Sequence, residues 1–264
     1  MLKNITLGQY FPGSSIIHRL DPRFKLVIAI ALIVLVFVIH TWWGYLAVAA
    51  FIVAAMLMSR ISLKFLIKGI KPLRWILIMT FILNIFCISG EKILLDWWIF
   101  TITEESLTGA VKIALRLILL LSATTVMTLT TSPMELTDGM ESMMRPLAKI
   151  KFPAHEIAMM MSIALRFIPT LMEETDRIMK AQTARGAAFD TGGILARAKG
   201  MIPILVPLFV SSFKRADELA DAMESRCYNG GKGRTRMKQL HIHAADRIAA
   251  GVTAVLGAAI IIYL

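Results

Sequence analysis

The chain alternates between long apolar runs and polar or charged segments. A helix needs about 20 residues to cross the hydrocarbon core of a bilayer, and most of the apolar runs approach that length. One of them is short and would have to borrow neighbouring residues. The pattern predicts an all-α, polytopic membrane protein with about five transmembrane helices. The apolar runs cover residues 24–40, 45–58, 73–89, 107–131 and 244–264.

Residues 132–243 follow a different pattern, in which expected helices mix apolar stretches with many charges. The first begins at Ser132-Pro133, because Ser caps a helix and Pro suits its first turn. Arg145-Pro146 should stop it. The expected helices run to about Met144, over about 153–183, and from about Gly193 to Ser225.

Two apolar stretches inside this segment resemble further spans. Residues 157–171 contain internal charge, and residues 201–213 are short and contain two prolines. We therefore expect helices that lie at or below the membrane surface. The alternative is a chain with seven spans, in which two spans are added between Pro153 and Phe213. The expected organisation is an N-terminal cytoplasmic segment (1–23), transmembrane helices (24–131), cytoplasmic or interfacial coupling helices (132–243) and a last transmembrane helix (244–264).

Composition supports the membrane location. The 264 residues are 57% hydrophobic and 18% charged, and the mean hydropathy is +0.69. A soluble domain rarely reaches such values. The net charge of +11 would suit a nucleic-acid-binding protein, but the basic residues cluster beside the apolar runs. We expect a lipid bilayer, and no nucleic acid, as the partner of these charges. The first residues lack the pattern of a signal peptide, since polar residues and charges interrupt them.

The distribution of charges predicts the orientation. The loop between the second and third runs is basic, whereas the loop after Ser89 is mainly acidic. The positive-inside rule then places the N-terminus inside and the C-terminus outside a bacterial plasma membrane, with residues 132–243 inside. Lys112 and Arg116 are awkward in this topology, because they lie near the outer leaflet. They either extend to the headgroups or face a protein partner.

A weak internal repeat carries the clearest functional signal. Ala181-Gln-Thr-Ala-Arg185-Gly186 is matched by Ala222-Met-Glu-Ser-Arg226-Cys227, and each copy lies where a long helix should end. Helix capping explains either arginine alone, because a cation in the last turn is worth about 0.3–1 kcal/mol. Capping requires no shared pattern, however. Small residues beside an arginine let another backbone come close to a guanidinium that binds carboxylates or carbonyls. The repeat therefore suggests docking onto a two-fold partner.

Further motifs resemble a known family. The stretch Gly8-Gln-Tyr-Phe-Pro-Gly13, followed by Leu20-Asp-Pro-Arg-Phe-Lys-Leu26, is similar to the N-terminal signature of energy-coupling factor (ECF) transporter T components, the EcfT family. The triplets Ala184-Arg185-Gly186 and Ser225-Arg226-Cys227 are similar to the paired Ala-Arg-Gly motifs of that family. The second triplet departs from the motif at Ser225 and Cys227. The resemblance covers the whole chain.

The resemblance implies a function. T components hold a substrate-binding S component in the membrane and two ATP-binding-cassette ATPases, EcfA and EcfA', below it. Their long coupling helices cross and place the two arginines in grooves on the ATPases. The chain would then be a non-catalytic scaffold for vitamin or micronutrient uptake, with no cofactor of its own, because ATP and Mg bind to the partner ATPases. Arg185 would contact one ATPase and Arg226 the other.

Methionines form a second candidate surface. Methionine is flexible and polarizable, so a methionine-rich surface could accept several S components. Plain packing is an equally good explanation, and both remain open. The candidate residues are Met140, Met143, Met144, Met159, Met160 and Met161.

Other chemical interpretations are weaker. The glycines and basic residues of 230–235 lack the spacing of a phosphate-binding loop, and His241 with His243 is a weak metal motif. Asp21-Pro22 suits the start of the first membrane helix, where Arg23 and Lys25 would anchor it at the headgroups. Two alternative functions remain: a permease that lines the solute path itself, and the scaffold of a dedicated cobalt or nickel importer.

Overall fold

The computed structural model describes residues 10–87, 93–97, 100–187, 189, 193–231 and 240–262, and it is predominantly α-helical. The chain divides into two compact units. The first is built from residues 8–139 and 240–264, and the second from residues 140–239, each within the described ranges. The helix α6 (Pro133–Met144) contains the boundary between them.

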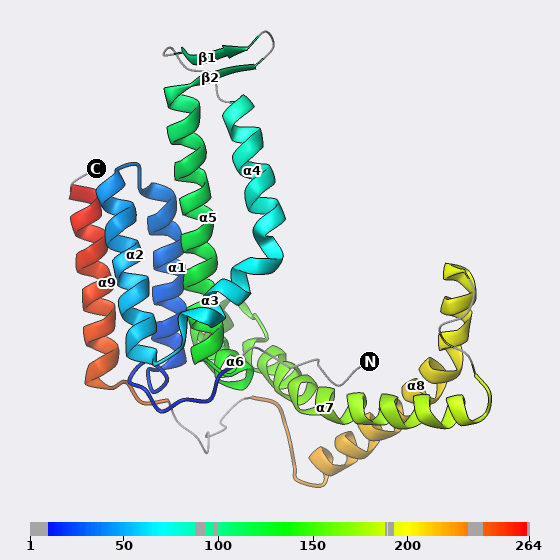
Figure 1. Ribbon diagram of the computed structural model, residues 1–264. Coiled ribbons are helices and arrows are strands. Elements are labelled where there is room, and N and C mark those ends of the chain that lie inside the picture. The colour runs from blue at the N-terminus through cyan, green and yellow to red at the C-terminus, as the bar shows by residue number, and fades with distance from the viewer. Residues whose placement is uncertain are drawn as a thin grey trace. The chain divides into compact units, whose positions relative to one another are not determined.

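The first unit is a bundle of apolar helices with a short hairpin. Figure 1 shows α1, α2, α5 and α9 running side by side, with α4 next to α5. Two antiparallel strands, paired through Trp97 and Phe100, precede α5. The elements are α1 (Pro22–Val38), α2 (Trp42–Ser59), α3 (Leu63–Ile70), the 3₁₀ turn η2 (Lys71–Leu73), α4 (Arg74–Cys87), β1 (Ile93–Trp97), β2 (Phe100–Thr103), α5 (Glu104–Thr130) and α9 (Ala244–Ile262).

Three helices of the described chain are long and apolar enough to cross a membrane, namely α2, α5 and α9. The first and third expected spans form shorter helices, of 17 residues in α1 and 14 described residues in α4. At 1.5 Å per residue, α1 is roughly 25 Å long, somewhat less than the hydrocarbon core. A helical membrane protein is confirmed, and the count of five spans stays a prediction.

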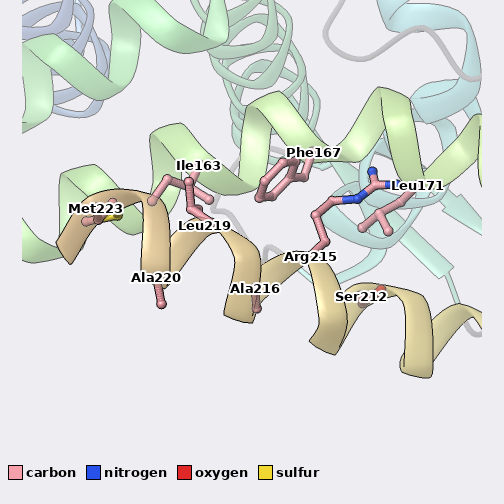
Figure 2. Close-up of a pocket in the computed structure, with 9 residues that line it drawn as sticks. All are labelled: Ile163, Phe167, Leu171, Ser212, Arg215, Ala216, Leu219, Ala220 and Met223. Carbon is pink, nitrogen blue, oxygen red and sulfur yellow. The ribbon is translucent and has the colours of Figure 1, made fainter. Parts of the chain in front are cut away.

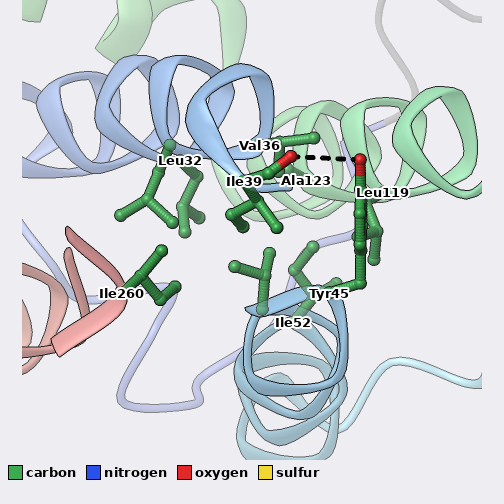
Figure 3. Packing of buried hydrophobic residues seen from close by; sticks show 10 residues of the cluster. Leu32, Val36, Ile39, Tyr45, Ile52, Leu119, Ala123 and Ile260 are labelled. Carbon is green, nitrogen blue, oxygen red and sulfur yellow. Dashed lines mark hydrogen bonds between the residues drawn. The ribbon is translucent and has the colours of Figure 1, made fainter. Parts of the chain in front are cut away.

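The core of the first unit lies where α1, α2 and α5 meet. Val36, Ile39 and Val48 have no exposed surface, and Leu119 of α5 packs against them. Figure 3 shows this cluster, with the hydroxyl of Tyr45 donating a hydrogen bond to the backbone oxygen of Ile39 at 3.3 Å. Burial of these side chains stabilises contacts between segments that are far apart in the sequence.

The two basic residues in the expected fourth span contact the protein's own helices. The guanidinium of Arg116 donates to the backbone oxygens of Val36 and Ile39, each at 3.2 Å, at the C-terminal end of α1. The ammonium of Lys112 lies 5.6 Å from the ring centroid of Trp42. Arg116 therefore satisfies carbonyls that a helix end leaves unpaired, and it also offsets the negative end of the helix dipole.

The start of α1 confirms one expectation and corrects another. Asp21 caps the helix, since its Oδ1 accepts a hydrogen bond from the backbone N–H of Arg23 at 2.9 Å, and Pro22 is the first helical residue. Lys25 does not anchor the helix at headgroups, and that expectation is wrong. Its ammonium is buried and donates to the backbone oxygens of His18 and Thr130, at 3.1 and 2.8 Å.

The second unit contains two long helices that pack on each other, α7 (Ala154–Ala184) and α8 (Ile194–Glu224), after a 3₁₀ segment, η3 (Arg145–Ile150). These boundaries confirm the three helices expected in 132–243 to within a few residues. Figure 1 shows α8 changing direction in its yellow first half, the part that contains Pro203 and Pro207. Prolines bend helices because they lack the N–H that the carbonyl four residues earlier would accept.

Candidate functional site

The first arginine-bearing turn ends α7. Arg185 is the C-cap residue, and Gly186 has a φ of 88°, in the left-handed region that favours glycine. The N–H of Gly186 donates to the oxygen of Thr183 at 2.9 Å, and the N–H of Ala187 donates to that of Gln182 at 3.0 Å. This pattern closes the helix and satisfies carbonyls at its end.

The second turn, after α8, repeats the first. The N–H of Cys227 donates to the oxygen of Glu224 at 2.8 Å, and the N–H of Tyr228 donates to that of Met223 at 3.0 Å. Cys227 has a φ of 56°, at the position that corresponds to Gly186. The sequence repeat is therefore also a repeat of backbone geometry. The changes at Ser225 and Cys227 leave the turn intact.

Both arginine side chains are available for binding. Arg185 and Arg226 are exposed, and neither forms an ion pair with another residue of the described chain. Ala184 and Ser225, the small residues before them, are exposed as well. Each turn thus presents a guanidinium with five N–H donors on a narrow helix end. Such an end can enter a groove and bind carboxylates or backbone oxygens there.

An apolar groove lies between α7 and α8 and reaches the second turn. Its cavity has a volume of about 270 Å³ (Figure 2). The guanidinium of Arg215 is 5.9 Å from the ring centroid of Phe167 and is the charged group in the lining. Met223 lines the groove, and its backbone oxygen accepts hydrogen bonds from the backbone N–H groups of Arg226 and Tyr228. A shift of α8 along this groove would therefore move the second arginine.

The candidate methionines lie on two helices and differ in exposure. Met143 of α6 and Met160 and Met161 of α7 are exposed. The remaining three, Met140, Met144 and Met159, are half-buried. Contacts with other described residues cover part of the surface of the three half-buried methionines. Such contacts do not explain the three exposed methionines.

An exposed apolar face on α8 is a further candidate surface to which the sequence analysis gave no role. Its side chains recur at the spacing of one helix face. The signal was present as the apolar stretch 201–213, but the sequence alone does not show which of those side chains are covered. The exposed residues are Met201, Ile202, Leu205, Val206, Phe209, Val210 and Phe213.

The structure adds little support for the weak metal-binding and phosphate-binding motifs. The backbone N–H of His243 donates to the buried carboxylate of Asp246 at 2.6 Å, which caps the start of α9. Residues 232–235 of the glycine-rich stretch lie outside the described residues. Within the described ranges, no three His, Cys, Asp or Glu side chains are grouped so that they could hold a metal ion.

Comparison with known proteins decides the family. The family model described as "Cobalt transport protein" (CbiQ) matches residues 13–237. The energy-coupling factor transporter transmembrane protein EcfT of Thermosediminibacter oceani is 54% identical over 257 residues, which are 96% of this chain and 97% of the relative. The chain belongs to the EcfT family.

Two other EcfT proteins support the assignment. That of Ruminiclostridium cellulolyticum is 49% identical over 255 residues, 97% of this chain and 95% of the relative. That of Bacillus subtilis is 48% identical over 240 residues, 91% of each chain. The resemblance drawn from the N-terminal signature and the two arginine triplets is thus confirmed. The chain is a transmembrane component of an ECF transporter, and its relatives are named as transporter transmembrane proteins.

Proposed function

We propose that this chain couples ATP hydrolysis in two partner ATPases, of the EcfA and EcfA' type, to the movement of a membrane-embedded S component that carries a vitamin or another micronutrient. The observation that supports the proposal most directly is the pair of arginine turns. They have matching hydrogen bonds and the same left-handed position after the arginine. Two equivalent ends suit two related subunits.

The turns would act as contacts and not as catalytic groups. Arg185 would bind in a groove of one ATPase and Arg226 in a groove of the other. ATP and Mg would bind to the ATPases, and no cofactor is assigned to this chain. Closure of the ATPase pair would displace the ends of α7 and α8, which pack on each other along the apolar groove. The displacement would then reach the S component.

The S component would contact exposed apolar side chains of the second unit. The candidates are the exposed methionines, Met143, Met160 and Met161, and the apolar face of α8. Large exposed apolar patches usually mark protein or membrane contacts, because leaving them in water is unfavourable. Methionines suit this role when several partners share one surface.

A charge reversal at both turns tests the proposal. Arg185→Glu with Arg226→Glu should abolish capture of the ATPases by the tagged chain and should abolish uptake. The single variants should each weaken capture of a different ATPase. The matched control is Arg177→Glu with Arg197→Glu, which makes the same charge change at exposed positions of the same two helices. The proposal fails if the first double variant still binds both ATPases.

A second candidate function is the T component of a cobalt importer. The matching family model, which describes cobalt transport proteins, favours it, whereas the names of the EcfT relatives specify no cargo. Mass spectrometry of the purified complex separates the two functions, since it identifies the S component that co-purifies. Uptake assays with labelled Co²⁺ and labelled vitamins would then name the cargo.

A further inference from the structure

The segment that joins α2 to α4 carries a cluster of unpaired positive charges. It contains no acidic residue between Ser59 and Trp75. The side chains of its basic residues are all exposed, and none forms an ion pair with another described residue. Like charges grouped without counter-charges attract an anionic partner. The residues are Arg60, Lys64, Lys68, Lys71 and Arg74.

Three of these residues, Lys64, Lys68 and Lys71, form what we call the cationic stripe. They follow each other at intervals of four and three residues along α3 and η2. Residues at these intervals lie above one another on one face of a helix. The cationic stripe therefore presents three ammonium groups in a row that extends over about two helical turns.

The opposite face of α3 holds the helix against the first unit. Leu66 packs against a buried apolar cluster of Met56, Ile61 and Leu129. Gly69 approaches α5 so closely that an added Cβ would lie 3.2 Å from the Oγ1 of Thr125. Since Leu66 and Gly69 lie on the inner side, the cationic stripe points away from the unit.

The neighbours of α3 have features that are typical of a helix at the level of lipid headgroups. Arg60 ends α2 abruptly in a left-handed turn, with a φ of 55°, and the chain then turns into α3. At the other end, the guanidinium of Arg74 lies 5.5 Å from the ring centroid of Trp75, a residue that is 68% exposed. Tryptophans gather at membrane–water interfaces. Figure 1 shows α3 running between the end of α2 and the start of α4.

We propose that the cationic stripe, with Arg60 and Arg74 at its ends, binds the phosphate groups of anionic phospholipids. Lysine stems can lie along apolar surface while their ammonium groups reach the headgroups. Each basic residue near an anionic membrane surface raises the affinity about fivefold. The interaction fixes the height and tilt of α3, which packs on α5. It does not depend on the proposed ATPase partners.

Native mass spectrometry of the full-length chain tests the proposal, with phosphatidylglycerol or phosphatidylcholine added to the detergent-solubilised protein. The wild type should retain phosphatidylglycerol in preference, and less of it as salt rises. The variant Lys64→Gln, Lys68→Gln and Lys71→Gln should lose retention at least tenfold. The matched control is Lys180→Gln, Lys199→Gln and Lys214→Gln, which removes three exposed ammonium groups from α7 and α8 and should keep retention.

Two further measurements keep the test decisive. Replacing the three lysines of the cationic stripe by arginine should preserve the retention of phosphatidylglycerol, because the charges remain. The thermal unfolding of the glutamine and arginine variants in phosphatidylcholine should match that of the wild type. The proposal is overturned if the glutamine variant keeps phosphatidylglycerol, or if the control loses as much. If the glutamine variant keeps the lipid but loses capture of the partner ATPases, the stripe is a protein-binding surface instead.

Discussion

At the residue scale, Cys227 adopts a backbone conformation that glycine would adopt more easily. Its φ of 56° corresponds to the 88° of Gly186 in the other turn. A side chain in the left-handed region costs roughly 1 kcal/mol. Cys227→Gly should therefore stabilise the second turn by up to about that amount. Hydrogen exchange should show slower exchange at Tyr228, whose N–H donates to Met223.

Two substitutions control for this effect. Cys227→Val should accelerate exchange at Tyr228, because a β-branched side chain is strained further at positive φ. Gly186→Ala should do the same at Ala187, where the open surroundings exclude a steric clash as the cause. Equal exchange in Cys227→Gly and Cys227→Val would show that backbone strain has no part in this turn. ATPase capture should persist in Cys227→Gly, since the arginine is unchanged.

Lys25 shows why single residues were the hardest to predict. A cation at the edge of an apolar run is typical of a headgroup anchor, and the sequence contains nothing against that interpretation. Its role depends on the backbone oxygen of Thr130, which is 105 residues away. Asp246 is similar, since its buried carboxylate accepts a hydrogen bond from the N–H of Asp21 at 2.8 Å. Contacts of this kind arise only once α1, α5 and α9 are assembled.

At the element scale, the helix boundaries were largely predictable, because local chemistry sets them. Ser132 accepts from the N–H of Glu135 and Glu135 accepts from that of Ser132, so the start of α6 needs no tertiary contact. Arg145-Pro146 ends that helix for the same local reason. The hairpin of β1 and β2 was missed. Its strands of five and four residues are short, and they stabilise each other only as a pair.

The exposed face of α8 leads to a prediction about a whole surface. Phe209→Asp with Phe213→Asp places two charges on that apolar face, which would be costly in an apolar interface. The double variant should lose capture of the S component and keep capture of both ATPases, because neither phenylalanine lies in an arginine turn. Co-purification followed by mass spectrometry measures both. The matched control is Lys214→Asp, which introduces an acid at an exposed position on the same part of α8.

The Lys214→Asp control and a vesicle-binding assay show whether the apolar face of α8 contacts the S component or lipid. Lys214→Asp should keep the S component, which would assign the loss to the apolar face and not to charge on α8. If the phenylalanine variant keeps the S component but no longer associates with vesicles, the face contacts lipid. Loss of both ATPases would instead indicate that α8 no longer folds, and circular dichroism would show it.

At the scale of the whole molecule, the division of the chain follows its chemistry. Among the described helices, the three that are long and apolar enough to cross a membrane belong to the first unit, and both arginine turns belong to the second. Under the proposed function, the first unit lies in the bilayer and the second contacts partners that hydrolyse ATP. The sequence repeat could be found without a structure because it is local. The matching backbone geometry of the two turns could not be predicted from the sequence, because Cys227 is an unusual residue at positive φ.

The orientation of the whole chain can be tested with the natural cysteine of the second turn. Cys227 is exposed and unpaired, and the proposed topology places it inside the cell. In a Cys87→Ser variant, a membrane-impermeant maleimide should therefore label Cys227 in inverted vesicles but not in intact cells. The comparison variant carries Cys87→Ser, Cys227→Ser and His40→Cys. His40 is exposed in the short connection between α1 and α2, on the expected outer side. It should show the reverse pattern, with labelling in intact cells.

Labelling of Cys227 from outside would invert the topology and remove both arginines from reach of cytoplasmic ATPases. Since the five-span and seven-span arrangements both keep Cys227 inside, such a result would refute either one, whatever the depth of α7 and α8.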